Sequence, residues 1–500
     1  MRIVHVMNFA RQFDKRFDDS EKLLLEATKR ELDIVNEYGI DNTFLLQYDA
    51  LIHPSYIELF KTCDSDHTEI GLWYEIVQPL CENAGIEWRG EAAWDWHVVP
   101  GFSMAYSIAD REKLADVAMN DFKDIYGFYP KTVASWLIDT HSLSYMSEKY
   151  GVEAFAICRD QVNTDAYTLV GGYFNQGYFP SKYNCFTPAQ TNENTIKTPV
   201  FRLLGPDPIH NYDNDKYLKN NKDKFGNVFT LEAAHPLANN REYMDWFFTT
   251  YFKNEDLGFS YAQIGQENGF SDEFVAENLK NQIDILLKHY PDVQFKKMSD
   301  TGKLFKEKYD CVTPATCVWA NTDWNTGEDI QSLYYDCKNY SVNLFRCENR
   351  VFIRSLYLFD DKIKEYYYDT PCTTWDALYE NLPVADTLLW QNNTGLGLSE
   401  NGKKVTVEKV SDSSIKATWG ENDKKVIFDE DKITIKTTDE ITFDISNASA
   451  DINVLNNRIE YNYKGNIYGI VVNGAKISVK NDFVCFQPIS GEIILSFVRR

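Results

Sequence analysis

Strand-like segments that end in an acidic or amide side chain recur through the first 300 residues, and most are followed by helix-like sequence. Six of these segments are TFLLQYDA with Asp49, HTEIGLWYE with Glu69 and Glu75, KTVASWLID with Asp139, AFAICRDQ with Asp160, VFTLEA with Glu232 and FSYAQIGQEN with Glu267. Alternation of strands and helices predicts a parallel sheet or a (β/α) barrel. Because the active site of such a barrel lies at the carboxyl ends of its strands, we expect these acids to gather at one mouth.

Aromatic and amide residues accompany the acids at these strand ends, and aromatic residues make up 15% of the chain. Some of them belong to the core. The flat C–H faces of pyranose rings also stack on aromatic rings. Acids beside Trp, Tyr, His and Asn are therefore typical of a carbohydrate site.

The chain of 500 residues is too long for one ordinary core, so we expect two or three domains. After residue 400, short segments of alternating apolar and polar residues follow one another, which is typical of a β-sandwich. The predicted fold is α/β: a distorted (β/α) barrel of seven or eight strands over residues 1–310, a β-rich connecting region packed on it over 311–395, and an all-β sandwich over 396–500.

Local patterns support this division. Apolar residues at helical spacing predict helices over 110–126, with Asp110 as its N-cap and Gly127 at its end, and over 271–290. Residues 162–200 are rich in Gly, Tyr, Asn and Gln without periodicity, which predicts an ordered loop over the barrel mouth. The segment YSVNLFRCENRVFIRSLYLFDD predicts a hairpin that turns near Glu348.

The formal net charge is −24, which disfavours nucleic acid as a partner. No stretch approaches the length of a membrane span. The first residues read as a strand rather than a signal peptide, and ten scattered cysteines without a CxxC pair suggest buried thiols. We expect a cytoplasmic protein, or a secreted one whose signal peptide has been removed. The expected partner is a carbohydrate; a homo-oligomer is compatible with the sequence.

Glu267 is the first catalytic candidate, because it follows a strand and is flanked by Gln266 and Asn268. Its alternative role is a strand-end salt bridge. Asp139 precedes Thr140 and could instead be the N-cap of the next helix. Glu75 begins a helix-like stretch, where a negative charge is favoured in any case, and Glu69 could pair with a neighbouring strand.

The segment WRGEAAWDWH carries three tryptophans with no helical or strand periodicity, which favours a stacking platform over core packing. We therefore expect its side chains, and those at the other strand ends, to bind substrate. The predicted substrate-binding residues are Asp49, Glu69, Trp73, Trp94, Asp95, Trp96, His97, His141, Asp160, Gln161, Gln266 and Asn268. Asp49 and Asp160 could instead orient the residues that touch substrate.

A metal site is the next alternative. Two Asp-x-His pairs occur, Asp95 with His97 and Asp139 with His141. One Asp with two His is a plausible ligand set, but no HxxxH or HExxH spacing is present. The sequence also lacks GxGxxG, GxxxxGK[ST] and GxSxG motifs. We assign no metal ligands and no cofactor.

The segments HTEIGLWYEI and GFYPKTVASWLIDTHSLSYMSEKYGV resemble NodB-type polysaccharide deacetylases and the related (β/α)7 barrels of glycoside hydrolase families 57 and 38. In the deacetylases, metal-binding histidines follow an EIG segment. Here EIG stands at 69–71 but is followed by Leu72 to Glu75, and the early Asp-Asp pair is reduced to Asp49. The overall pattern also looks like an uncharacterised bacterial carbohydrate-active family with a β-sandwich behind the barrel. The resemblance implies a carbohydrate-active barrel whose acids suit glycosidase chemistry.

Three hypotheses follow. The first is a glycoside hydrolase, in which Glu267 and Asp139 form the carboxyl pair, with Glu75 in reserve. The second is a metal-dependent, deacetylase-like hydrolase that uses Asp49, His97 and His141. The third is a sugar-binding protein without catalysis.

Overall fold

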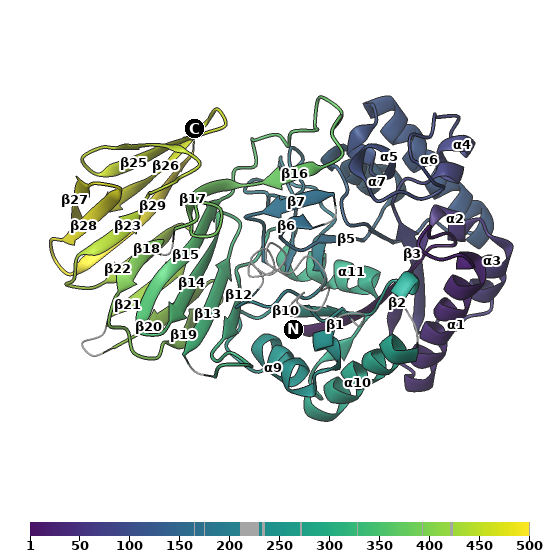
Figure 1. Ribbon diagram of the computed structural model, residues 1–500, viewed down its shortest axis with the longest axis horizontal. Coiled ribbons are helices and arrows are strands. Elements are labelled where there is room, and N and C mark those ends of the chain that lie inside the picture. The colour runs from purple at the N-terminus through teal and green to yellow at the C-terminus, as the bar shows by residue number, and fades with distance from the viewer. Residues whose placement is uncertain are drawn as a thin grey trace.

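The structure is a computed structural model. It describes residues 1–164, 166–174, 176–210, 230–232, 236–270, 273–327, 329–392, 394–420 and 424–499. A sheet in the first part of the chain forms a nearly closed barrel with helices outside it, and antiparallel sheets follow (Figure 1). The predicted order of an α/β barrel and then β structure is confirmed.

Seven strands of the barrel run parallel, as strand–helix alternation predicts. In sheet order they are β10 (Ser260–Ile264), β1 (Arg2–Ala10), β2 (Asn42–Gln47), β3 (Thr68–Trp73), β4 (Thr132–Ala134), β5 (Ala154–Cys158) and β9 (Val200–Leu203). The short β8 (Gly177–Tyr178) pairs antiparallel with β9, and β11 (Gln294–Phe295) pairs with β1. The Leu204 amide donates to the Gln263 side chain (2.8 Å), which links the ends of β9 and β10.

The helices pack their apolar faces against the sheet. They are α1 (Ser20–Tyr38), α2 (Tyr48–Leu51), α3 (Pro54–Lys61), α4 (Gln78–Asn83), α5 (Val98–Gly101), α6 (Ile108–Tyr126), α7 (Thr140–Tyr150), α9 (Arg241–Phe252), α10 (Glu273–His289) and α11 (Met298–Tyr309). Inside the barrel, Met7, Leu45, Phe201 and Phe305 belong to one buried apolar cluster. Because the interior is packed, a substrate site has to lie at a mouth.

Helix α6 begins earlier than predicted. Its N-cap is Ser107, whose Oγ accepts a hydrogen bond from the Asp110 amide (3.2 Å). A serine hydroxyl at this position satisfies one of the free amides of the first turn, so Asp110 lies inside the helix. The helix ends at Gly127, as expected, where φ is +88°.

The predicted loop over 162–200 contains strands. β6 (Gln161–Thr164) and β7 (Tyr167–Val170) form a three-stranded sheet with β16 (Ala377–Glu380), and β9 follows the loop. The strand predicted in VFTLEA lies partly outside the described residues; Thr230 makes only an isolated bridge with Pro206. Strands β6 and β7 have only four residues each, and β7 also pairs with the distant β16. Runs this short show no clear alternation in the sequence.

Two antiparallel sheets make up the C-terminal part and share one apolar core. The first contains β12 (Thr316–Ala320), β13 (Ile330–Asp336), β14 (Tyr340–Cys347), β15 (Arg350–Leu358), β18 (Leu396–Ser399), β23 (Ile441–Asp444), β28 (Phe483–Pro488) and β27 (Ala475–Lys480), with β17 (Leu382–Asp386) paired to β15. The second contains β19 (Thr406–Ser411), β20 (Ser414–Thr418), β21 (Lys425–Asp429), β22 (Lys432–Lys436), β29 (Glu492–Arg499), β26 (Asn466–Asn473), β25 (Arg458–Tyr463) and β24 (Asp451–Val454).

The predicted hairpin is β14–β15, and Glu348 in its turn has a φ of +56°. The boundary expected at 395 falls between β17 and β18, both of which pair with β15. Among the described helices, none is both long enough and apolar enough to cross a membrane.

Candidate active site

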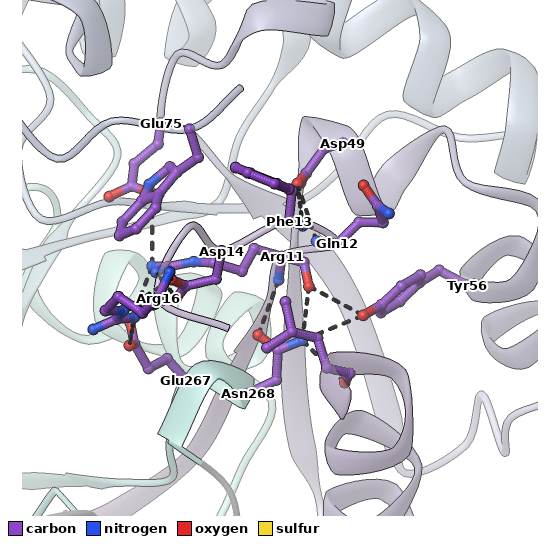
Figure 2. A network of polar contacts seen from close by, with 12 residues as sticks. Arg11, Gln12, Phe13, Asp14, Arg16, Asp49, Tyr56, Glu75, Glu267 and Asn268 are labelled. Carbon is purple, nitrogen blue, oxygen red and sulfur yellow. Dashed lines mark hydrogen bonds and ion pairs between the residues drawn. The ribbon is translucent and has the colours of Figure 1, made fainter. Parts of the chain in front are cut away.

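A buried arginine lies at the centre of the polar cluster at the carboxyl ends of the barrel strands. β1 ends at Ala10, and the next residue, Arg11, is almost fully buried. Its guanidinium lies between the carboxylates of Glu267 and Glu75 (Figure 2). The same guanidinium lies over the ring of Trp94. Strands β1, β3 and β10 therefore deliver one residue each to the same point.

Two carboxylates share a single nitrogen of this arginine. Arg11 Nη2 lies 3.0 Å from Glu267 Oε2 and 3.9 Å from Glu75 Oε2. The sum of these two distances is the upper limit on the separation of the two oxygens. That limit falls within the range of about 5 to 9.5 Å over which paired glycosidase carboxyls are found.

A second arginine covers Glu267 from the solvent side. Arg16 Nη2 lies 3.0 Å from Glu267 Oε1, and the same guanidinium binds Asp14. Asp14 also contacts Arg11, at 3.3 Å. Charge-assisted bonds of this kind fix geometry strongly, so the loop 11–16 holds Glu267 in one orientation.

Aromatic rings surround the two carboxyls. Trp94 Nε1 donates to Glu75 Oε2 (3.1 Å), and its ring centroid lies 4.0 Å from the Arg11 guanidinium carbon. Beside Glu267, Trp73 stacks on Phe9 with centroids 3.9 Å apart, and Trp136 meets both edge to face. A pocket of about 250 Å³ is lined by these three rings together with Glu232, Gln266 and Glu267.

Burial raises the pKa values of both carboxyls, and the number of arginines that oppose this rise differs between them. Glu75 is 2% exposed and Glu267 is 3% exposed. Burial raises the pKa of Glu75 to about 7; Arg11 opposes this and the charge of Glu267 adds to it. Burial also raises the pKa of Glu267, but there two guanidinium groups, of Arg11 and Arg16, work against it. At neutral pH, Glu75 can hold a proton, and the two guanidinium groups favour the ionised form of Glu267.

Close packing of two backbones places Glu267. Gly265 follows β10 with a φ of +115°, and a Cβ there would clash with the Met7 carbonyl oxygen of β1. The Phe9 amide then donates to the Gln266 carbonyl (3.2 Å). A residue with a side chain at 265 would push the strand end, and Glu267 with it, away from Arg11.

We expect Gly265→Ala to destabilise the protein more than Gly127→Ala does, by about 1–3 kcal/mol, and to lower the affinity or activity of the site. Gly127 is the matched control, because it also has a positive φ (+88°) but no atom within 4 Å of the added Cβ. Urea unfolding of both variants measures the difference. Equal losses for both variants would mean that the contact with β1 does not matter.

Several predicted substrate-binding residues instead support the loop 11–16. Asp49 Oδ2 accepts from the amides of Gln12 (3.0 Å) and Phe13 (2.9 Å). Asn268 is bonded on both sides to Arg11, accepting from its amide (3.1 Å) and donating to its carbonyl (2.8 Å). Gln266 donates to Glu232 (3.3 Å) and lines the pocket itself.

Asp139 follows the end of β4 by five residues and does not belong to this cluster. Its carboxylate is buried against Arg111 (2.9 Å), accepts from Ser103 Oγ (2.5 Å) and accepts from the Ser142 amide as the N-cap of α7 (3.1 Å). Asp139 therefore has the alternative role that the sequence indicated, the N-cap of the next helix. The expected pairing of Asp139 with Glu267 is absent among the contacts of the described residues, and Glu75 stands beside Glu267 instead.

The WDWH segment divides between the cluster and its rim. Trp94 belongs to the cluster, whereas the half-exposed Trp96 lies under the Lys15 ammonium (4.0 Å). Asp95 accepts from the amide of His97 (3.1 Å) and contacts its ring Nδ1 (2.7 Å), which shapes the loop.

The remaining candidates lie elsewhere. Asp160 binds Arg202 (2.7 Å) and the Gly172 amide (3.0 Å), and Gln161 opens β6. Glu69 lies near the start of β3, at the opposite end of the barrel, where it accepts from Thr43, Thr132 and the Ser299 amide. The prediction that Glu69 lies at the carboxyl end of its strand is wrong, because β3 runs from Thr68 to Trp73 and Glu69 is its second residue.

The metal set considered from the sequence is dispersed. His141 pairs with Glu112 (3.0 Å), His97 with Asp95, and Asp49 with backbone amides. Within the described residues, no group of three or more His, Cys, Asp or Glu side chains could hold a metal ion. The donor sets that a deacetylase metal needs are thus not assembled there.

Sequence reasoning missed Arg11, Asp14, Arg16 and Trp136, all of which belong to the cluster or its pocket. The signal was available for the first three, because they follow directly after the N-terminal strand RIVHVMNFA. Acids and histidines alone do not define the site, because Arg11 and Arg16 hold Glu267 in place.

Comparison with known proteins shows the fold. A family model described as "Domain of Unknown Function with solved-structure structure (DUF3863)" matches residues 97–314. A crystal structure from Parabacteroides distasonis, described as a "putative glycoside hydrolase/deacetylase", is similar with a TM-score of 0.55 at 13% identity, over 75% of this chain and 89% of that one. The expected resemblance is thereby confirmed at the level of the fold.

Two further crystal structures are similar over less of the chain. One, from Mycobacterium smegmatis, is described as a "putative polysaccharide deacetylase" (TM-score 0.38, 11% identity, 61% of this chain and 91% of that one). The other is TK1436, a GH57 branching enzyme from Thermococcus kodakaraensis (TM-score 0.32, 9% identity, 62% and 71%). No curated protein sequence matches the chain.

Proposed function

We propose that this protein is a carbohydrate-active hydrolase, and specifically a glycoside hydrolase that uses Glu75 and Glu267. The observation that carries the proposal is the placement of these two buried carboxyls on one nitrogen of Arg11, at the carboxyl ends of parallel barrel strands. The rings of Trp73, Trp94 and Trp136 beside them supply apolar faces for a sugar. The fold shared with the Parabacteroides distasonis protein supports the substrate class.

The two carboxyls would divide the chemistry. Glu75, with its pKa of about 7, would give its proton to the glycosidic oxygen as the bond from that oxygen to the anomeric carbon breaks. Glu267 would either bond to the anomeric carbon or take a proton from the water that attacks it. Arg11 and Arg16 keep Glu267 ionised and oriented, and Arg16, which is partly exposed, would have to move aside when substrate enters.

A second candidate function is sugar binding without turnover. The two arginines on Glu267 favour it, because a carboxylate that stays ion-paired is a poor nucleophile. The metal-dependent deacetylase receives no such support from the described residues.

The test is a screen of the wild-type protein against aryl glycosides and plant or host oligosaccharides, with and without EDTA. Turnover that resists EDTA supports the glycosidase and identifies the sugar. Turnover that EDTA abolishes would replace it with a metal-dependent hydrolase. Binding without turnover, measured on the same panel by calorimetry, would favour the second candidate.

The rate constant kcat/KM is expected to fall as the pH rises through about 7, because Glu75 must be protonated to act as an acid and its pKa is about 7. A pH profile checks this on a substrate with a poor leaving group. Glu75→Gln should lower the rate by about 10²–10⁴-fold and remove the alkaline limb. The loss should be smaller on nitrophenyl glycosides, whose leaving group needs no proton. An alkaline limb that persists in Glu75→Gln would assign the acid to another residue.

A further inference from the structure

Strand β16 lies between the barrel and the C-terminal sheets (Figure 1). Residues of β16 line a second pocket together with residues from distant parts of the sequence. The space within its walls is about 480 Å³, including the part that is open to solvent. The lining residues come from three segments that are far apart in the sequence. These are the loop between β8 and β9 with Asn184 and Thr187, strand β16 and the residue after it with Tyr379 and Asn381, and β25 and β26 with Tyr463 and Asn466.

The floor of the pocket holds a polar group that lacks a protein partner. Tyr379 is 3% exposed, and its hydroxyl has no hydrogen-bond partner within the described part of the chain. A buried hydroxyl without a partner is unfavourable, so such a group points to an absent ligand or water. Asn381, by contrast, is fully engaged by Thr187 and by two backbone carbonyls, and it stiffens the floor.

Glu365 supplies a second polar group on the same floor. Its carboxyl is buried and accepts from the amide (3.1 Å) and hydroxyl (2.5 Å) of Thr140. Burial, aided by the charge of Asp139, raises the pKa of Glu365 to about 8. At neutral pH this carboxyl can therefore donate a hydrogen bond as well as accept one.

The rim presents aromatic rings that the protein holds in place. Tyr463 donates to Glu380 Oε2 (2.6 Å), Lys464 Nζ binds Glu380 Oε1 (2.6 Å), and the Tyr366 hydroxyl donates to the same carboxylate. Tyr366 nevertheless leaves 46% of its surface exposed. A ring fixed by its hydroxyl and open on its surface is suited to stacking against an apolar C–H face.

The charges around the pocket select against anions. Asp360 and Glu380 line it, and the one lysine among the described lining residues, Lys364, already pairs with Asp369 (2.7 Å). A carboxylate or phosphate ligand would meet acids without a free cation to balance its charge. The fitting ligand is neutral, rich in hydroxyls and flat on one face.

We propose that this pocket is a second carbohydrate-binding site, which takes one neutral sugar unit with its hydroxyls on Tyr379 and Glu365 and its ring against Tyr366. The site does not depend on catalysis at the barrel mouth, because none of its lining residues belongs to the cluster around Arg11. It would hold one unit of a chain, or a free monosaccharide, at the junction of barrel and β sheets.

The test is calorimetric titration of the whole protein with glucose, galactose, mannose, xylose and N-acetylglucosamine, followed by galacturonate and glucosamine. Tyr379→Phe removes one oxygen and keeps the ring, so it should fold; Tyr366→Ala removes the platform. We expect the Kd for a neutral sugar to rise about tenfold or more in each variant. Phe128→Ala is the matched control, since Phe128 is 47% exposed on another part of the surface, and it should leave the Kd unchanged.

Glu267→Gln separates this site from the barrel mouth. Binding that survives Glu267→Gln and is weakened by Tyr379→Phe supports the second site, whatever the result of the hydrolase screen. Binding lost in Glu267→Gln but retained in Tyr379→Phe would place the sugar at the barrel mouth and overturn the proposal. It would also be overturned if no neutral sugar bound, or if galacturonate or glucosamine bound while the neutral sugars did not.

Discussion

Glu267→Gln is expected to lower kcat by about 10³-fold or more on the substrate that the screen identifies, with little change in substrate affinity. Glutamine keeps the shape of the side chain and one oxygen, which can accept from either Arg11 or Arg16, because the two arginines bind different oxygens of Glu267. It can neither attack the anomeric carbon nor accept a proton from water. Steady-state kinetics give kcat, and calorimetry on the variant gives the affinity.

Glu307→Gln is the control for this loss, because Glu307 is an exposed glutamate on α11 and away from the barrel mouth. It should retain full activity. The thermal midpoint of each variant shows whether the protein is still folded. A folded Glu267→Gln protein with near wild-type kcat would remove Glu267 from the chemistry.

Glu267→Ala distinguishes the two possible roles of this carboxylate. If it is a nucleophile, azide should restore turnover by taking its place between the two arginines and should appear in a glycosyl azide product. In that case the enzyme retains configuration, so the azide product should have the anomeric configuration opposite to that of the normal product. If Glu267 is a base that activates water, the enzyme inverts configuration, and any glycosyl azide should have the same anomeric configuration as the normal product. The stereochemistry of the wild-type product, read by NMR, must agree with the outcome.

Arg111→Met is expected to lower the free energy of unfolding by about 3–5 kcal/mol, because it leaves the carboxylate of Asp139 buried without its cation. Arg111 and Asp139 are both fully buried and 2.9 Å apart. The guanidinium also donates to the carbonyls of Met104 and Tyr106, each at 2.9 Å. Methionine preserves most of the apolar stem, so the loss reports the charge and its hydrogen bonds. Urea unfolding followed by tryptophan fluorescence measures it.

Lys280→Met provides the comparison. Lys280 forms an exposed ion pair with Glu37 (3.0 Å), and losing such a pair costs about 0–1 kcal/mol. The folded fraction of Arg111→Met should keep the wild-type kcat, since its partner Asp139 lies outside the proposed catalytic pair. A large fall in kcat with unchanged stability would support a catalytic role for Asp139, which its position after a strand predicts.

The barrel was predictable because most of its strands are largely apolar runs with a polar residue at or just after the end. Examples are Arg11 after β1, Gln47 in β2 and Glu75 after β3. The β-sheet region was also predictable, because alternation along strands such as β22 and β25 matches one buried and one exposed face. Strand β9 was missed because four residues give no periodicity and their pairing with β5 is set by the fold.

The site was only partly predictable. Glu267, Glu75 and Trp94 were recognised from their positions after strands or in an aromatic segment, and the structure brings these three together. Which acid lies next to Glu267 depends on the number of residues between that acid and the end of the preceding strand. Asp139 is five residues past the end of β4, which carries it into the N-cap of α7, whereas Glu75 is two residues past β3. Distances of this kind come from loop geometry, which residue patterns do not encode.

The strand β16 has a consequence for how this chain can be divided. It lies beyond residue 370 in the sequence, yet it extends the sheet of β7 and β6, which follow β5 of the barrel. The backbone of the same region also accepts from Arg111 and from the Val98 amide. A barrel expressed alone would present the open edge of β7, which invites association between copies. The barrel and the C-terminal β region therefore cannot be exchanged independently. A chimaera with another β region would need a strand that pairs with the edge of β7 as β16 does.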